Sequence, residues 1–233
     1  MESDPNFVRL GSMMGPAYTE LFIRKFIHTG HYYLYVPHRS TVYTHWPVLF
    51  FLHGSGGNFK AYTWILSSLA EKEGMVLIVP SFGFGNWSRS EGINFILEVL
   101  DDVSKFVPID LKSVYLAGLS NGGRGVSRLA DNYPDRFKGL IYISPVLEDD
   151  VLSKDSFVKH WRHKPVLVIT GENDDRIPLA YVQDRISKWH NQGLNAEEII
   201  YKNEDHFLIF SKSKNVNNDI SNWLTKIKNS PNF

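Results

Sequence analysis

Cysteine is absent from this chain of 233 residues, and so are an excess of either charge and any long apolar stretch. Without cysteine the chain can form no disulfide, and it can offer neither a cysteine nucleophile nor a thiolate metal site. Basic and acidic residues balance at 25 each, so the composition gives no reason to expect nucleic acid or an anionic membrane as a partner. We expect neither a metal nor a cofactor.

The apolar runs have the length of strands and are too short to cross a bilayer. The chain starts with the acidic stretch Met1 to Asp4, and no long apolar region follows it, so no signal peptide is predicted. These features predict a cytoplasmic protein without stable membrane association. They leave the oligomeric state open.

Hydrophobic periodicity predicts one α/β domain over residues 20–233, preceded by an irregular arm over residues 1–19. Two β-like runs, residues 20–28 and 31–36, predict an antiparallel hairpin. Strands are then predicted at residues 47–52, 75–79, 113–117, 139–143, 165–170 and 197–201. Helical patterns separate these strands, and such alternation requires crossover connections. We therefore expect a mostly parallel sheet of about eight strands with helices on both faces.

One pentapeptide, Gly118-Leu119-Ser120-Asn121-Gly122, lies between a predicted strand and a predicted helix. Gly-x-Ser-x-Gly in this setting is typical of a nucleophile elbow, a strained turn that holds the serine Oγ clear of the sheet. Glycine is expected two positions on either side because larger side chains would collide there. The same residue types are common in ordinary turns, so the motif alone also fits a plain turn.

A glycine-rich loop, His53 to Asn58, follows the strand predicted at residues 47–52. We expect the Ser55 N–H and the Asn121 N–H to form an oxyanion hole. The alternative is a simple glycine-rich turn or a phosphate loop, but the Gly-Lys-Ser/Thr ending of a Walker motif and the Rossmann glycine spacing are both missing. His53 itself is expected to have a structural role.

Asp174 and His206 each follow a later strand, so they should reach the same edge of the sheet as Ser120. Asp174 is the preferred acid, with Asp175 and the acidic run 148–150 as alternatives. Asp174 or Asp175 could instead only cap the next helix. His206 is the one histidine placed after the last predicted strand.

The order Ser120, Asp174, His206 is that of the α/β-hydrolases and differs from the other serine-triad folds. From about residue 20 onward the chain resembles this superfamily, and within it the polyhydroxybutyrate-depolymerase and feruloyl-esterase group. The stretches that carry the resemblance are Tyr32 to Pro37, His53 to Asn58, Val114 to Gly123 and Tyr133 to Phe137. Two features depart from it: the signal sequence and disulfides common in secreted members are missing, and Asp205 precedes His206 where glycine is frequent.

The resemblance implies a serine esterase with an α/β-hydrolase fold, in which Ser120 attacks an ester, His206 takes the proton and Asp174 orients the imidazole. The segment between residues 144 and 164 is short and predicts one helix rather than a large cap, so small acyl or aryl esters are expected. Phe82, Trp87 and Phe207 could line an apolar pocket or could simply pack within their loops. A thioesterase or peptidase would use the same triad, and a non-catalytic binding protein could use the same scaffold.

Overall fold

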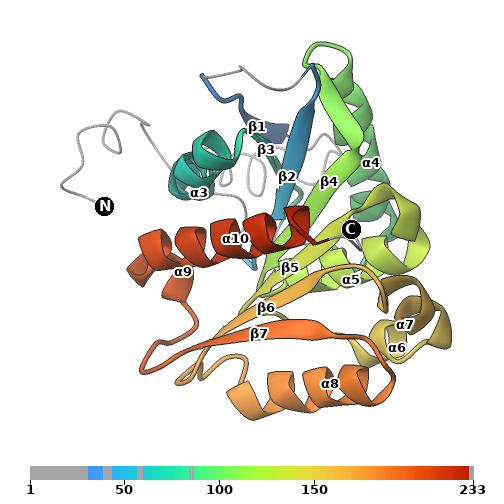
Figure 1. Ribbon diagram of the computed structural model, residues 1–233, viewed down its shortest axis with the longest axis vertical. Coiled ribbons are helices and arrows are strands. Elements are labelled where there is room, and N and C mark those ends of the chain that lie inside the picture. Colours follow the sequence, from blue (N-terminus) through green and yellow to red (C-terminus); the bar gives the residue numbers. More distant parts are fainter. Residues whose placement is uncertain (1–30, 39–43, 57–59, 84, 86, 231–233) are drawn as a thin grey trace.

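A twisted sheet runs through the centre of the molecule (Figure 1). The computed structural model describes residues 31–38, 44–56, 60–83, 85 and 87–230. Within these residues the strands are β1 (His31–Tyr35), β2 (Trp46–Leu52), β3 (Val76–Ser81), β4 (Ile109–Leu119), β5 (Gly139–Ile143), β6 (Val166–Gly171) and β7 (Ala196–Tyr201). They form one seven-stranded sheet in the order β1-β3-β2-β4-β5-β6-β7.

The strand directions confirm the predicted mostly parallel sheet. Each neighbouring pair from β3 through β2 and β4 to β7 is parallel, whereas β1 runs antiparallel to β3 at one edge. All six strands predicted after the hairpin are present, although β4 begins at Ile109 rather than at residue 113. The predicted arm over residues 1–19 and the first hairpin strand over residues 20–28 lie outside the described residues.

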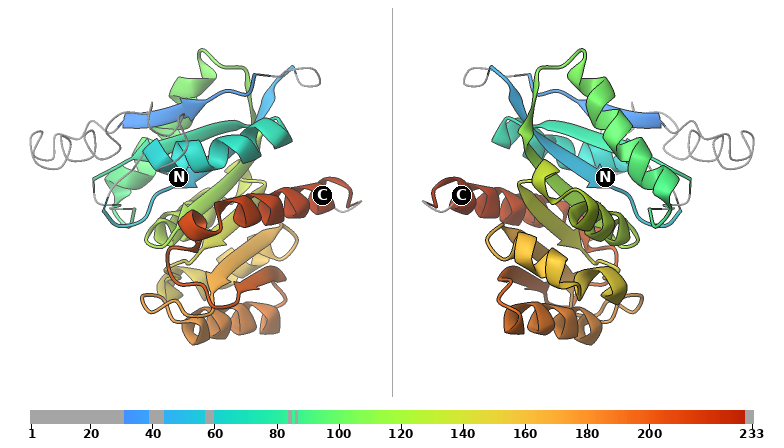
Figure 2. Two further views of the ribbon diagram at one scale, coloured as in Figure 1. Left: turned by 90° about the vertical axis from the view of Figure 1, so that its left-hand side faces the viewer. Right: turned by 90° about the vertical axis from the view of Figure 1, so that its right-hand side faces the viewer.

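Helices cover both faces of this sheet, as predicted. They are α3 (Lys60–Glu73), α4 (Ser90–Ser104), α5 (Gly122–Asn132), α6 (Asp149–Leu152), α7 (Asp155–Trp161), α8 (Leu179–Asn191), α9 (Leu208–Ser211) and α10 (Ser213–Lys228), with a short 3-10 helix, η2 (Pro134–Arg136). Successive strand side chains point to opposite faces, so each buried strand contributes to two cores. One core joins the sheet to α4–α8, and the other joins it to α3, α9 and α10, which lie on the opposite side (Figure 2).

The segment between β5 and β6 folds into two short helices, α6 and α7, where the sequence predicted one. At the end of the first helix the Ser153 hydroxyl and the Ser153 N–H both donate to the Asp149 carbonyl oxygen, at 2.5 and 3.0 Å. Trp161 of α7 is fully buried, and its Nε1 donates to the Ala130 carbonyl oxygen of α5 at 3.0 Å. The segment therefore covers the sheet beside α5 and forms no separate layer of its own.

The parallel direction of β2 and β4–β7 places their carboxyl ends at one edge of the sheet. The loops that follow β2, β6 and β7 carry Ser55, Asp174 and His206, and the turn after β4 carries Ser120. Among the described helices, none combines the length and the apolar character that crossing a membrane requires.

Replacing Trp161 by alanine should lower the free energy of unfolding by about 3–5 kcal/mol, because it leaves a large cavity between α7 and α5. Urea denaturation followed by circular dichroism measures this loss. Phe106→Ala is the matched control, since Phe106 is 58% exposed and its removal should change stability by less than about 0.5 kcal/mol. Equal effects of the two substitutions would contradict the packing described for α7.

Candidate active site

Ser120 occupies the sharp turn between β4 and α5. Its backbone φ of 51° lies in the left-handed region, which residues other than glycine rarely adopt. The turn is fixed by two hydrogen bonds to the chain at the end of β5. The Ser120 N–H donates to the Ile143 carbonyl oxygen at 2.9 Å, and the Ser120 carbonyl oxygen accepts from the Val146 N–H at 2.9 Å. The strained geometry expected of a nucleophile elbow is therefore present.

The two glycines of the pentapeptide are required by close contacts. A Cβ at Gly118 would lie 2.6 Å from the carbonyl carbon of Gly122, and a Cβ at Gly122 would lie 2.3 Å from the carbonyl oxygen of Leu52. Both distances are shorter than real contacts, and backbone atoms cannot move aside cheaply. The collision predicted from the sequence is confirmed, and α5 can begin this close to β2 only without a side chain at position 122.

Asp174 and His206 meet at the same edge of the sheet. The His206 Nδ1 lies 2.8 Å from Asp174 Oδ2 and 3.0 Å from Oδ1, and both side chains are buried. A carboxylate only accepts, so the proton of this bond belongs to Nδ1, which leaves Nε2 of a neutral imidazole free to accept another. The N–H groups of Arg176 and Ile177 also donate to Asp174 Oδ1, at 3.0 and 2.8 Å. The carboxylate thus orders its own loop and orients the imidazole.

The structure supports neither of the alternatives for the acidic residues, helix capping by Asp174 or a different carboxylate as the partner of His206. The residue before α8 is Pro178, which provides no side-chain cap, so Asp174 does not cap that helix. The acidic run 148–150 forms ion pairs with arginines of α5 and α8. Asp175 is exposed. Asp174 is the carboxylate that contacts His206 among the described residues.

The described residues contain no hydrogen bond between the Ser120 hydroxyl and His206. Such bonds are often long in the absence of substrate and shorten in the reacting complex. The Ser120 side chain is partly exposed at the edge where the imidazole also lies.

The glycine-rich loop passes directly beside Ser120. A Cβ built on Gly54 would lie 3.3 Å from the Cβ of Ser120, so the next residue, the exposed Ser55, stands at the mouth of the turn. The Asn121 N–H at the start of α5 donates to no acceptor within the described part of the chain, while its side chain donates to the Gly85 carbonyl oxygen. The structure therefore brings the loop that carries Ser55 beside the serine, and Asn121 follows the serine directly; their role as an oxyanion hole stays a prediction.

His53 and Trp87 hold this loop in place. The His53 Nδ1 donates to the Gly54 carbonyl oxygen at 2.7 Å, and its Nε2 accepts from the Phe82 N–H at 3.3 Å. Trp87 Nε1 donates to the His53 carbonyl oxygen at 2.8 Å, and the Trp87 side chain is completely buried. The structural role predicted for His53 is confirmed. The Trp87 ring packs against this loop and presents no surface to solvent, which agrees with the loop-packing alternative, and its contact with substrate stays a prediction.

The other two aromatic residues predicted to contact substrate differ from each other. Phe82 is half-buried and packs against Trp87 and Phe95, with ring centroids 6.3 and 5.5 Å apart. Phe207 is 45% exposed, and its ring stands edge-on to that of His206 with 5.7 Å between the centroids. Phe207 is therefore the aromatic residue of the three that offers both exposure and contact with the candidate base.

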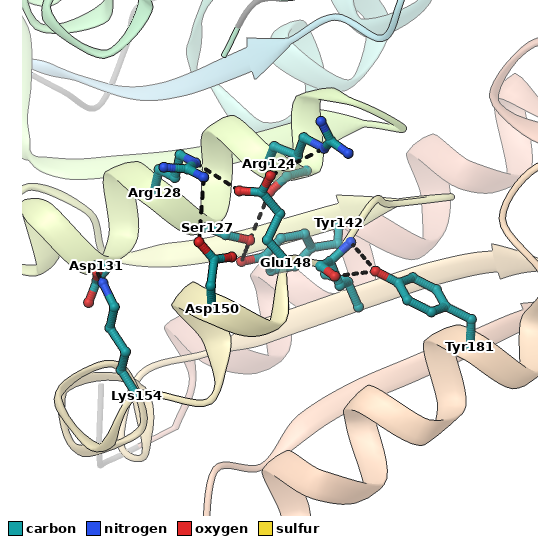
Figure 3. A network of polar contacts seen from close by, with 11 residues as sticks. Arg124, Ser127, Arg128, Asp131, Tyr142, Glu148, Asp150, Lys154 and Tyr181 are labelled. Carbon is teal, nitrogen blue, oxygen red and sulfur yellow. Dashed lines mark hydrogen bonds and ion pairs between the residues drawn. The ribbon is translucent and has the colours of Figure 1, made fainter. Parts of the chain in front are cut away.

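A polar network that was not predicted from the sequence fixes the loop after β5 (Figure 3). The Tyr181 hydroxyl of α8 donates to the Leu147 carbonyl oxygen and accepts from the Leu147 N–H at 3.1 Å. Burial raises the pKa of Tyr181, so its hydroxyl keeps the donated proton. Glu148 bonds Arg128 Nε at 2.7 Å and pairs with Arg124 at 3.4 Å. The spacing of these two arginines on one helix face was the available signal.

Comparison with known proteins identifies a family for this chain. A family model described as serine aminopeptidase, S33, matches residues 45–168, which include the glycine-rich loop and Ser120 but neither Asp174 nor His206. The chain is 26% identical over 156 residues to a bifunctional acetylxylan esterase/xylanase of Neocallimastix patriciarum, covering 63% of this chain and 22% of that protein. It is 23% identical over 212 residues to dipeptidyl-peptidase 5 of Porphyromonas gingivalis, covering 70% and 31%. This chain thus spans well under half the length of these curated relatives.

Solved structures of low sequence identity share the fold of this chain. Est1E from Butyrivibrio proteoclasticus superposes with a TM-score of 0.64 at 17% identity, covering 84% of this chain and 95% of that one. FphF, a fluorophosphonate-binding serine hydrolase of Staphylococcus aureus, superposes with a TM-score of 0.68 at 16% identity, covering 83% and 98%. The fold is the one these proteins share. Because the family model spans more than half of its residues, the chain belongs to the serine aminopeptidase S33 family of α/β-hydrolases.

Proposed function

We propose that this protein is a serine hydrolase that cleaves carboxylic esters through an acyl-enzyme on Ser120. One observation carries the proposal. A buried Asp174–His206 pair, joined at 2.8 Å, lies at the sheet edge where Ser120 is held in a left-handed backbone conformation. Local strain of this kind persists where the surrounding structure enforces it, and it concentrates at active sites.

The reaction follows from these groups. Ser120 Oγ attacks the ester carbonyl carbon while His206 Nε2 takes the hydroxyl proton, and Asp174 stabilises the imidazolium that forms. The N–H groups of Ser55 and Asn121 bind the developing oxyanion, at about 3 kcal/mol for each donor. The imidazolium then gives its proton to the leaving alcohol oxygen. Water, activated by the same imidazole, hydrolyses the acyl-enzyme and restores Ser120.

Small acyl or aryl esters are the substrates that the surroundings favour. The helices α6 and α7 pack against the sheet, so the segment in which caps are often inserted is used for the core. The exposed ring of Phe207 supplies apolar surface beside His206. The curated relatives include an acetylxylan esterase and a putative esterase, NocK, of Nocardia uniformis subsp. tsuyamanensis. The cytoplasmic location and the single domain over residues 20–233 stay predictions from the sequence.

A peptidase is the second candidate, because the matched family is described as a serine aminopeptidase and one relative is a dipeptidyl-peptidase. A thioesterase would use the same groups. Oxyester, thioester and amide substrates with one common acyl group separate these three activities. A non-catalytic binding protein on the same scaffold would turn over none of them, and its serine would not react with a fluorophosphonate probe.

Replacing Ser120 by alanine should reduce ester turnover by at least about a thousandfold, because the attacking oxygen is lost. It should also abolish labelling by a fluorophosphonate probe while the thermal unfolding midpoint stays within a few degrees. Ser104→Ala is the matched control, since Ser104 is exposed at the end of α4. Turnover by Ser120→Ala equal to that of the control would exclude Ser120 as the nucleophile.

Replacing Asp174 by asparagine should lower kcat by about four orders of magnitude, because an amide can donate to Nδ1 and favours the wrong imidazole tautomer. Asp175→Asn removes the same charge one residue away and should keep kcat within about twofold. Steady-state kinetics on a 4-nitrophenyl ester measure both. Similar losses in the two variants would mean that the loop needs its charge rather than this one carboxylate.

Lowering the pH over the range in which the fold stays intact should lower activity, because the imidazole of His206 must be neutral to accept the serine proton. A profile of kcat/KM against pH measures the fall, which should follow a single protonation. Binding of a neutral, unreactive substrate analogue provides the control and should change little over this range. A flat kcat/KM profile would argue against His206 as the base.

A further inference from the structure

Arg176 lies beside the candidate base and is fixed at two points. Its backbone N–H donates to Asp174 Oδ1 at 3.0 Å. Its guanidinium carbon lies 4.6 Å from the ring centroid of Phe207, and that ring is 5.7 Å from the imidazole of His206. The guanidinium carbon of Arg176 therefore lies no further from the centroid of the His206 imidazole than the sum of these two distances.

The positive charge of Arg176 faces solvent without a carboxylate partner among the described residues. This is unexpected because both loops around it are acidic. The other carboxylates that bond within these loops have their own donors: Glu172 accepts from the Asn203 N–H, Asp205 from the Phe207 N–H, and Glu204 from the Ser211 hydroxyl and Lys212. Arg176 stacks on Phe207 instead, a contact that orders the guanidinium plane and leaves its N–H groups open at the edge.

Other arginines near this edge are compensated. Arg124 on the first turn of α5 pairs with Glu148, and Arg185 of α8 pairs with Asp149. A guanidinium already held by a carboxylate has fewer N–H groups for a second anion. Arg176 differs from both because its planar group is preorganised by an aromatic ring rather than neutralised by an acid.

The position of Arg176 also indicates which part of a substrate it would meet. In acyl transfer the imidazolium protonates the oxygen of the leaving alcohol, so the alcohol part lies over the histidine. Phe207 follows His206 in the chain and exposes nearly half of its surface there. We propose that Arg176 is a specificity-determining residue that selects esters whose alcohol part carries an anionic group such as a carboxylate. This inference rests on the proposed ester hydrolysis.

The test compares 4-acetoxybenzoate with its uncharged methyl ester in wild type and in Arg176→Met, which keeps an apolar stem over Phe207. The ratio of kcat/KM for the anionic ester to that for the neutral ester should fall about fivefold in the variant, mainly through KM. Arg176→Lys should keep part of the preference, and added salt should weaken that of wild type. Arg136→Met, at the opposite end of the sheet, removes an equal charge and should leave the ratio unchanged.

Three outcomes would overturn the inference. An unchanged ratio in Arg176→Met, with normal turnover of the methyl ester, removes the role of Arg176 and leaves ester hydrolysis standing. An equal fall in Arg136→Met assigns the preference to the overall charge. A fall seen only for an anion on the acyl side, tested with mono-4-nitrophenyl succinate against 4-nitrophenyl butyrate, refutes contact with the alcohol part. Absence of both ester turnover and fluorophosphonate labelling would instead remove the proposed function and this inference with it.

Discussion

The backbone of Ser120 is the constraint on which the rest of this site depends. Its left-handed conformation costs free energy, of order 1–3 kcal/mol, and two bonds to the chain at the end of β5 offset part of that cost. The bare backbone of Gly122 lets α5 approach Leu52 closely enough to complete the turn. The position of the serine is therefore set by three strands and one helix, and a loop alone could not hold it.

Much of this architecture could be read from the sequence because its signals are local. Apolar runs marked most of the parallel strands, and the pentapeptide around Ser120 marked the turn. The pairing of Asp174 with His206 could be predicted because strand direction alone brings the ends of β6 and β7 together. Chain order then distinguished this arrangement from other serine triads.

The sequence left open those properties of the site that depend on tertiary packing. Trp87 and Phe207 are both aromatic residues in loops that follow strands. Trp87 is buried against the loop of His53, whereas Phe207 is open to solvent. Nothing in their immediate sequence separates them. The ion pairs of Glu148 and the stacking of Arg176 on Phe207 join segments far apart in the chain, so no local pattern could reveal both partners.

The hydroxyl of Tyr181 connects the segment that carries Asp174 to the segment that supports Ser120. Tyr181 belongs to the first turn of α8, directly after the loop of Asp174, and its hydroxyl forms hydrogen bonds with the backbone of Leu147. The neighbouring Val146 supports the carbonyl oxygen of Ser120. Acid and nucleophile are consequently linked through one series of hydrogen bonds, so a displacement of α8 would shift the loop of Asp174 and the turn of Ser120 together.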